Sequence, residues 1–222
     1  MDWTALDLSL RLAGWTVALL LPLSLVLGRF LAFRQFPGKP LAEALVMLPL
    51  VLPPTVMGFY LLEAFGVTSP FGQAWAGLFG RPLVFSFEGL VLASVISSLP
   101  FAVLPAQRGF QAVPLEVREA AACCGMSPLR ALWRVDLPLA WPGVATAMVL
   151  VFAHTLGEFG VVLMVGGAIP GETRTISIAI YDRVQAFDTA SAATMSAVLV
   201  AISVFTIAVT FALSARVGRR LS

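Results

Sequence analysis

The chain has 222 residues, of which 59% are hydrophobic and 12% are charged, and its formal net charge is +2. Soluble domains carry roughly 25% charged residues, so this chain cannot cover its surface with polar groups and must face lipid over much of its length. The small net charge gives no reason to expect a nucleic-acid partner. The two cysteines, Cys123 and Cys124, are neighbours, a spacing that suits neither a disulfide nor a zinc motif.

Long charge-free runs locate the membrane spans, because lipid-facing and buried helix faces are both apolar. Runs close to or above the ~20 residues of one crossing are Leu12–Gly28, Ala44–Leu62, Gly89–Gln107, Leu137–Gly157 and Thr189–Ala215. A sixth run, Phe159–Gly171, is too short to cross alone. We expect it to complete the fourth span after Glu158 and to turn at Gly166-Gly167. The sequence therefore predicts an all-α integral membrane protein of about five transmembrane helices.

Basic residues are distributed unevenly over the segments that join these spans. With the amino end outside, ten of the 14 lie on the cytoplasmic side. The four on the outer side are Arg11, Arg81, Arg174 and Arg183. Cytoplasmic segments of multi-pass proteins carry an excess of Lys and Arg, so we expect the amino end outside and the carboxyl end in the cytoplasm. The acidic amino end does not resemble a secretory signal, so we expect the first span to be retained.

Prolines interrupt the second span at Pro49, Pro53 and Pro54. Each proline removes a backbone donor, and a carbonyl freed inside a membrane needs a partner in protein or in a watery cavity. Two interpretations stay open: Pro53 and Pro54 line a transport pathway, or they produce a structural kink.

The longest polar stretch of the chain, residues 108–138, lies between the third and fourth spans. Within it, Gly125 can close one short helix in the left-handed conformation. Ser127 then suits the N-cap, and Pro128 the first position, of a second short helix over Leu129–Val135. We expect a compact cytoplasmic knob that can pass the movement of a soluble partner to the adjoining spans.

Two ionisable residues, His154 and Glu158, lie within the fourth span and share one helix face. An ionisable residue in a membrane is a functional hypothesis, because leaving it in lipid is costly. For Glu158 we favour a structural ion pair or hydrogen bond near the outer side, with Arg174 as the candidate partner. Contact with a transport pathway is the alternative, and a proton relay through His154 is a third interpretation.

The outer segment 169–188 has the pattern of an amphipathic helix that lies at the interface or over a cavity. Its apolar residues at helical spacing are Ile176, Ile180, Val184 and Phe187. Arg174 and Arg183 in this region could meet an anion or a docking protein, or could belong to a solvated face.

Several motifs resemble one family of transport proteins. The order Glu119-Ala120-Ala121, Gly125, Leu137-Pro138 resembles the EAA loop of ABC-importer permeases. Further motifs are similar to those of the molybdate branch: Phe36-Pro37-Gly38-Lys39, Leu48–Pro54, Leu156–Gly160 and Ile169–Thr175.

The resemblance implies one permease domain over residues 1–222, with the MetI-like core of type I importers, in the bacterial inner membrane. It implies a homodimer, two ATPase subunits docked on the coupling loop 108–138, and a periplasmic protein that delivers molybdate or tungstate. The coupling residues would be Glu119, Ala120, Ala121, Gly125, Leu137 and Pro138. The pathway or gate candidates are Pro53, Pro54, His154, Glu158 and Arg174. A carboxylate is a poor ligand for an oxyanion, which favours the structural role of Glu158.

No catalytic, metal or cofactor site is expected in this chain, and ATP and Mg would bind to the partner ATPase. A phosphate-binding loop ends in Gly-Lys-Ser/Thr, whereas the single lysine, Lys39, is followed by Pro40. A sulfate or other oxyanion permease is the nearest alternative. A secondary transporter or channel would need inverted repeats or rings of intramembrane charge, and neither is visible. An intramembrane enzyme would need a nucleophile and base or metal ligands, and one histidine excludes most such sites.

Overall fold

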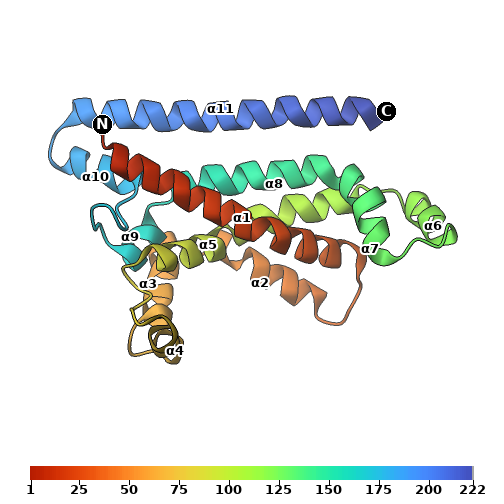
Figure 1. The fold of residues 1–222 in the computed structure, drawn as a ribbon, viewed down its shortest axis with the longest axis horizontal. Coiled ribbons are helices and arrows are strands. Elements are labelled where there is room, and N and C mark those ends of the chain that lie inside the picture. Colours follow the sequence, from red (N-terminus) through yellow and green to blue (C-terminus); the bar gives the residue numbers. More distant parts are fainter. Residues whose placement is uncertain (222) are drawn as a thin grey trace.

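The computed structural model describes residues 1–221, and every regular element in that range is helical. In chain order the helices are α1 (Trp3–Phe33), α2 (Lys39–Val51), α3 (Pro54–Phe65), α4 (Pro70–Phe79), α5 (Phe87–Gln111), α6 (Leu115–Cys123), α7 (Pro128–Ala131), the π-helical turn η1 (Leu132–Asp136), α8 (Leu137–Gly157), α9 (Gly160–Gly166), α10 (Ile176–Gln185) and α11 (Thr189–Leu221). The long helices run along the molecule, α11 follows one edge, and α3, α4 and α9 gather at the end opposite to α6 and α7 (Figure 1).

Among the residues that the structure describes, four helices are long and apolar enough to cross a membrane: α1, α5, the continuous helix Pro128–Gly157 and the Thr189–Thr210 part of α11. The pair α2 and α3 makes a fifth candidate span, which confirms the prediction of about five. This span is not the single helix that the run Ala44–Leu62 predicts, because its two halves are bent by 108°. Pro53 adopts an extended backbone with ψ of 134°, and its ring cannot continue the hydrogen bonding of α2.

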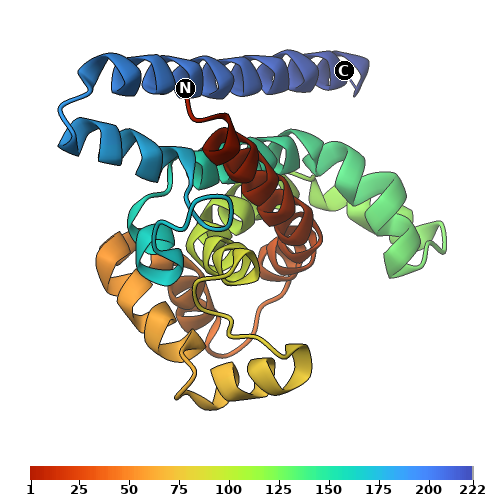
Figure 2. The same ribbon diagram turned by 60° about the vertical axis from the view of Figure 1, so that its left-hand side comes forward.

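The centre of the molecule is formed by α1, α5 and α8, which lie side by side in both views (Figures 1 and 2). Leu20, Ala102 and Val151, one from each helix, are fully buried against one another. Small residues let α5 and α8 approach closely: a Cβ added to Gly143 would lie 2.7 Å from the Cα of Gly109. Such close approach of backbones is a common way for membrane helices to associate.

The fourth span does not continue through Glu158, so the prediction that Phe159–Gly171 completes it is wrong. α8 ends at Gly157, and α9 begins separately at Gly160. The predicted turn is present, since α9 ends at Gly166 and Gly167 has a φ of +66°. α9 packs against α3, where Val161 and Val165 share a buried cluster with Met57 and Phe65. Apolar runs show where lipid or a core is near, but they do not show where a helix breaks.

The loop after the third span also differs from its prediction in one respect. α6 ends beside Gly125 as expected, and Ser127 accepts a hydrogen bond from the backbone N–H of Arg130 (3.4 Å). The second helix is not a short separate one, however. It runs from Pro128 through the π-helical turn η1 into α8 without a break.

The amphipathic helix of the outer segment is confirmed as α10, but its buried face is not the predicted one. Ile176, Ile178 and Ala179 are buried, whereas Val184 is 50% and Phe187 91% exposed. Ile176 and Ala179 share a buried cluster with α1 and α11 residues, and this cluster covers the first turns of α10.

Candidate functional site

A cavity of about 520 Å³ lies where α3 begins, α8 ends and α9 begins. Its lining comprises Pro54, Thr55, Ala153, His154, Gly157, Glu158, Phe159 and Gly160. Three of the predicted pathway residues, Pro54, His154 and Glu158, therefore meet at one place, although Pro54 lies about 100 positions before the other two in sequence. Pro53 is the N-cap residue of α3 and lies next to this lining. The bend in the second span and the break after the fourth face the same cavity.

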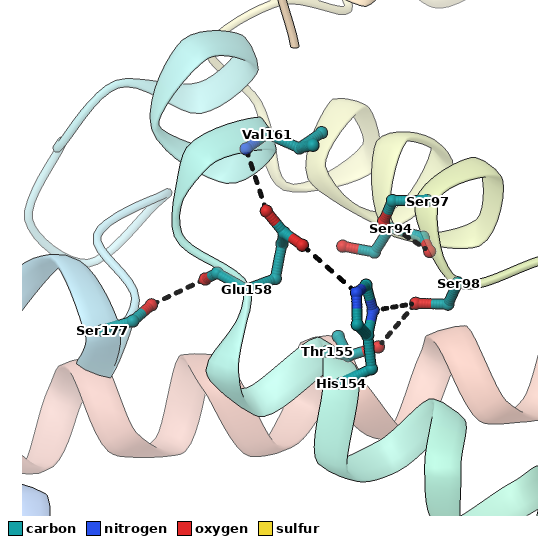
Figure 3. A network of polar contacts seen from close by, with 8 residues as sticks. All are labelled: Ser94, Ser97, Ser98, His154, Thr155, Glu158, Val161 and Ser177. Carbon is teal, nitrogen blue, oxygen red and sulfur yellow. Dashed lines mark hydrogen bonds and ion pairs between the residues drawn. The ribbon is translucent and has the colours of Figure 1, made fainter. Parts of the chain in front are cut away.

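Glu158 is a buried carboxylate that joins three segments of the chain (Figure 3). Its Oε1 accepts a hydrogen bond from the backbone N–H of Val161 at 3.0 Å and so satisfies one free donor at the start of α9. Its Oε2 lies 3.5 Å from Nε2 of His154, and its carbonyl oxygen accepts a hydrogen bond from Ser177 Oγ at 2.7 Å. Glu158 thus connects the end of α8 with α9 and α10.

His154 is held from both sides in the same network (Figure 3). Its Nδ1 lies 3.0 Å from Ser98 Oγ, and its ring stacks on Phe101 with centroids 4.2 Å apart. Ser98 also lies 3.3 Å from the hydroxyl of Thr155. A neutral imidazole with its proton on Nε2 satisfies both contacts, because it points a donor at Glu158 and accepts from Ser98. The two residues that their spacing predicted to share one helix face are therefore in contact.

Arg174 is not the partner of Glu158, and that prediction is wrong. Its Nη2 lies 2.8 Å from Asp182 of α10, and its Nη1 lies 3.8 Å from Asp2. Its side chain is only 23% exposed, and its Nε is buried without a partner in the described part of the chain. Arg174 therefore ties the amino end of α1 to α10, in a region separate from the lining of the cavity.

The EAA-like residues Glu119 to Gly125 lie on α6 and on its closing turn, at the opposite end of the molecule from α3 and α9 (Figure 1). The amide N–H of Gly125 donates to the carbonyl of Ala122 (2.9 Å), and that of Met126 donates to the carbonyl of Ala121 (3.1 Å). With the φ of Gly125 at +70°, this is the Schellman arrangement that ends many helices. Glu119 and Ala120 are exposed, and Ala121 is buried.

The surface around α6 exposes large apolar side chains. Leu115, Leu129 and Trp133 are 60%, 66% and 59% exposed. Cys123 and Cys124 are also exposed and free, while Leu137 and Pro138 are half-buried at the start of α8. Clustered apolar exposure next to charged residues marks many protein-docking surfaces.

A polar cluster beneath α6 was missed by the sequence reasoning. Asp136, at the end of η1, is 1% exposed. It pairs with Arg29 of α1, which donates from Nε at 2.8 Å, and lies 3.8 Å from Nε of Arg118 on α6. One signal could have found it: Asp136 is the single acidic residue between Glu119 and Glu158, and it stands at the start of a span.

Comparison with known proteins places these features in one family. The family model "Binding-protein-dependent transport system inner membrane component" matches residues 24–222. The molybdenum transport system permease protein ModB of Azotobacter vinelandii is 47% identical over 191 residues, which cover 86% of this chain and 84% of the relative. ModB of Escherichia coli K12 is 37% identical over 83% of this chain and 80% of its own length.

A solved structure supports the fold independently of close sequence similarity. A bacterial ABC transporter that imports the acidic polysaccharide alginate has a chain with a TM-score of 0.77 and 15% identity. The match covers 96% of this chain and 78% of that one. With a family model that spans residues 24–222 and relatives matched over most of their length, the chain belongs to the binding-protein-dependent transport system inner membrane components.

Proposed function

We propose that this chain is the permease subunit of an ATP-driven importer that moves molybdate, and with it tungstate, into the cytoplasm. The observation that carries the proposal is the 47% identity to a molybdenum transport permease over 86% of the chain. A putative molybdenum transport permease of Bacillus subtilis is also 37% identical over 81% of the chain.

In this proposal the chain works as one permease domain, residues 1–222, in a homodimer with two separate ATPase subunits and a periplasmic binding protein. Another solved structure of the alginate transporter is described as a complex with a periplasmic protein bound to an alginate pentasaccharide, which supports a binding-protein partner for this fold. The coupling loop 108–138 is the proposed site of ATPase docking, because α6 exposes charged and apolar groups together.

The excess of basic residues around α6 favours a cytoplasmic position for this end of the molecule. The amino end and the 169–188 segment would then face the periplasm. The cavity beside Pro54, His154 and Glu158 lies at the end opposite to α6, where we place the outer part of the transport pathway. Pro53 and Pro54 would line or gate it, while His154 and Glu158 hold its wall in shape. Arg174 is paired with Asp2 and Asp182 and would hold the amino end of α1 against α10 on this side.

Sulfate is the second candidate substrate, because molybdate and sulfate are both tetrahedral dianions. The sulfate transport system permease protein CysT of Escherichia coli K12 is 32% identical over 89% of this chain. The higher identity to molybdenum permeases favours molybdate.

Growth of a strain that lacks this chain separates the two substrates. We expect molybdoenzyme activity to fall at trace molybdate and to recover with excess molybdate, while sulfate assimilation stays intact. A sulfur requirement with normal molybdoenzyme activity would assign the chain to sulfate. Purification under mild conditions tests the coupling proposal separately: an ATPase subunit should accompany the chain, and its absence would favour a secondary transporter or channel.

A further inference from the structure

The buried carboxylate of Asp136 is shared by two arginines that come from different parts of the chain. Arg29 of α1 places Nε and Nη2 each 2.8 Å from Oδ2. Arg118 of α6 places Nε 3.8 Å from Oδ1. The Asp136 side chain is 2% exposed, whereas those of Arg29 and Arg118 are 28% and 31% exposed. A buried charge is tolerated where it is paired, so this carboxylate needs its arginines to stay in place.

Arg29 and Arg118 connect Asp136 to different helices. The Arg29 contact is short and joins α1 to the start of α8, two of the helices that form the centre of the molecule. The Arg118 contact is longer, and it joins α6 to the same carboxylate. The Arg118 guanidinium also lies 3.4 Å from the ring centroid of Phe33 on α1. Phe33 in turn packs edge-on against the buried Phe110 of α5, with ring centroids 6.0 Å apart.

Apolar packing alone holds α6 weakly, because this helix buries one residue, Ala121. Arg118 adds two contacts that hold this helix against its neighbours, one with Asp136 and one with the ring of Phe33 on α1. The carboxylate that Arg118 approaches stands at the end of η1, and π-helical turns are frequent at functional sites of helices.

We infer that Asp136 is a positioning residue that passes displacement of α6 to the spans α1 and α8, through Arg118 on one side and Arg29 on the other. The inference rests on the proposed function, since an ATPase docked on α6 would supply the displacement. Arg29 keeps the two spans together, and Arg118 connects them to the moving helix. The two contacts should therefore respond differently to substitution.

The test uses the complete transporter, with its ATPase and binding protein, reconstituted in vesicles. Arg118→Gln removes one of the two cations that face Asp136 and leaves the Arg29 contact intact. Arg34→Gln is the matched control, because Arg34 lines the same surface pocket as Arg29 and Arg118 but forms no ion pair within the described residues. Three quantities are measured: yield of the assembled complex, ATP hydrolysed, and molybdate taken up per ATP.

We expect Arg118→Gln to assemble in normal yield and to hydrolyse ATP, but to lose about fivefold or more in molybdate taken up per ATP, as coupling energies between sites typically allow. Arg34→Gln should match the wild type. Arg118→Lys, which keeps the positive charge near Asp136, should recover most of the lost ratio. A purely structural ion pair would instead lower yield and leave the ratio unchanged, and that result would overturn the inference.

Asp136→Asn supplies a second measurement, because it removes the shared charge itself. In that background Arg118→Gln should cause no additional loss of uptake per ATP, since the two residues act through one contact. Independent, additive losses would contradict the inference. Failure of the proposed function looks different: the wild-type chain would then bind no ATPase at all, or ATP would not drive its molybdate uptake.

Discussion

Glu158 lies where one helix ends and the next begins, and its carboxylate serves as a cap for α9. The donor it satisfies is the backbone N–H of Val161, which is fully buried. An unpaired buried donor costs about 1–3 kcal/mol, so this cap contributes to the stability of the α8–α9 junction. His154 and Ser177 hold the same residue from two other directions.

Replacement of Glu158 separates the cap from the charge. Glu158→Gln keeps an oxygen that accepts from Val161 and should change the thermal stability of the purified protein little. Glu158→Ala removes the acceptor and should destabilise the protein by about 1–3 kcal/mol. Thermal unfolding in detergent compares the two. If Glu158→Gln transports molybdate as well as the wild type, the charge has no part in the pathway; a loss of transport with normal stability would assign it one.

Gly125 is the residue of the coupling loop that another amino acid can least easily replace, because of its backbone conformation. Its φ of +70° costs an ordinary residue about 1–2 kcal/mol, and a β-branched side chain is disfavoured most. Gly125→Val should therefore distort the end of α6 and reduce molybdate uptake per ATP hydrolysed. Gly125→Asn is the control, because asparagine adopts this conformation more readily. Equal uptake per ATP in both variants would show that the loop geometry is not needed for coupling.

At the scale of helices, the apolar runs predicted the number of spans but not their breaks. The run Ala44–Leu62 looks the same in sequence whether it is one kinked helix or two helices at 108°. The difference comes from a tertiary contact, because α3 packs on α9, which follows it by about 100 residues in the chain. α4 was not predicted at all, although Ser69 caps it and Pro70 begins it, because its ten residues are too few for a membrane crossing.

Ion pairs between residues that are far apart in the sequence could not be predicted either. The spacing of four between His154 and Glu158 predicted that they share one helix face, but not that they contact each other. The contact of Asp136 with Arg29 joins residues 107 positions apart, and no local pattern encodes it.

The packing of α3 on α9 should hold the bend of the second span more firmly than its prolines do. Pro54 occupies the first position of α3, where proline is tolerated because that N–H has no helical partner. Pro54→Ala should change stability by less than about 0.5 kcal/mol, whereas Met57→Ala, in the buried cluster with Val161, should cost about 2–5 kcal/mol. Thermal unfolding of both variants measures this. A larger loss for Pro54→Ala would show that the proline itself sets the bend.

At the scale of the whole molecule, the two ends of the helix bundle differ in composition and in exposed chemistry. α1 begins at the end that carries α10, and α11 ends at the end that carries α6 (Figure 1). An odd number of crossings requires such an arrangement, with the two termini on opposite sides of the membrane. In the proposed orientation the coupling loop lies on the cytoplasmic side and the cavity lies toward the outer side.

The native cysteines offer a direct test of orientation. Both are exposed and lie on the side that we assign to the cytoplasm. When the chain is expressed without its neighbours, a membrane-impermeant maleimide should leave it unlabelled in intact cells and should label it after the membranes are opened. On a background with both cysteines replaced by serine, Phe187→Cys should react in intact cells, since Phe187 is 91% exposed. The reverse pattern would reject the proposed orientation.

The bent pair α2 and α3 also has a consequence for biosynthesis. With 13 and 12 residues and a rise of about 1.5 Å per residue, each helix reaches roughly two thirds of the ~30 Å hydrocarbon layer. Neither can enter lipid as an independent crossing during translation. The buried face of α3 is covered by α9, which the ribosome makes much later. The α2–α3 segment therefore stays incompletely packed during translation until residues beyond 160 have been synthesised. Truncated chains that end before α9 should be preferred targets of membrane quality-control proteases.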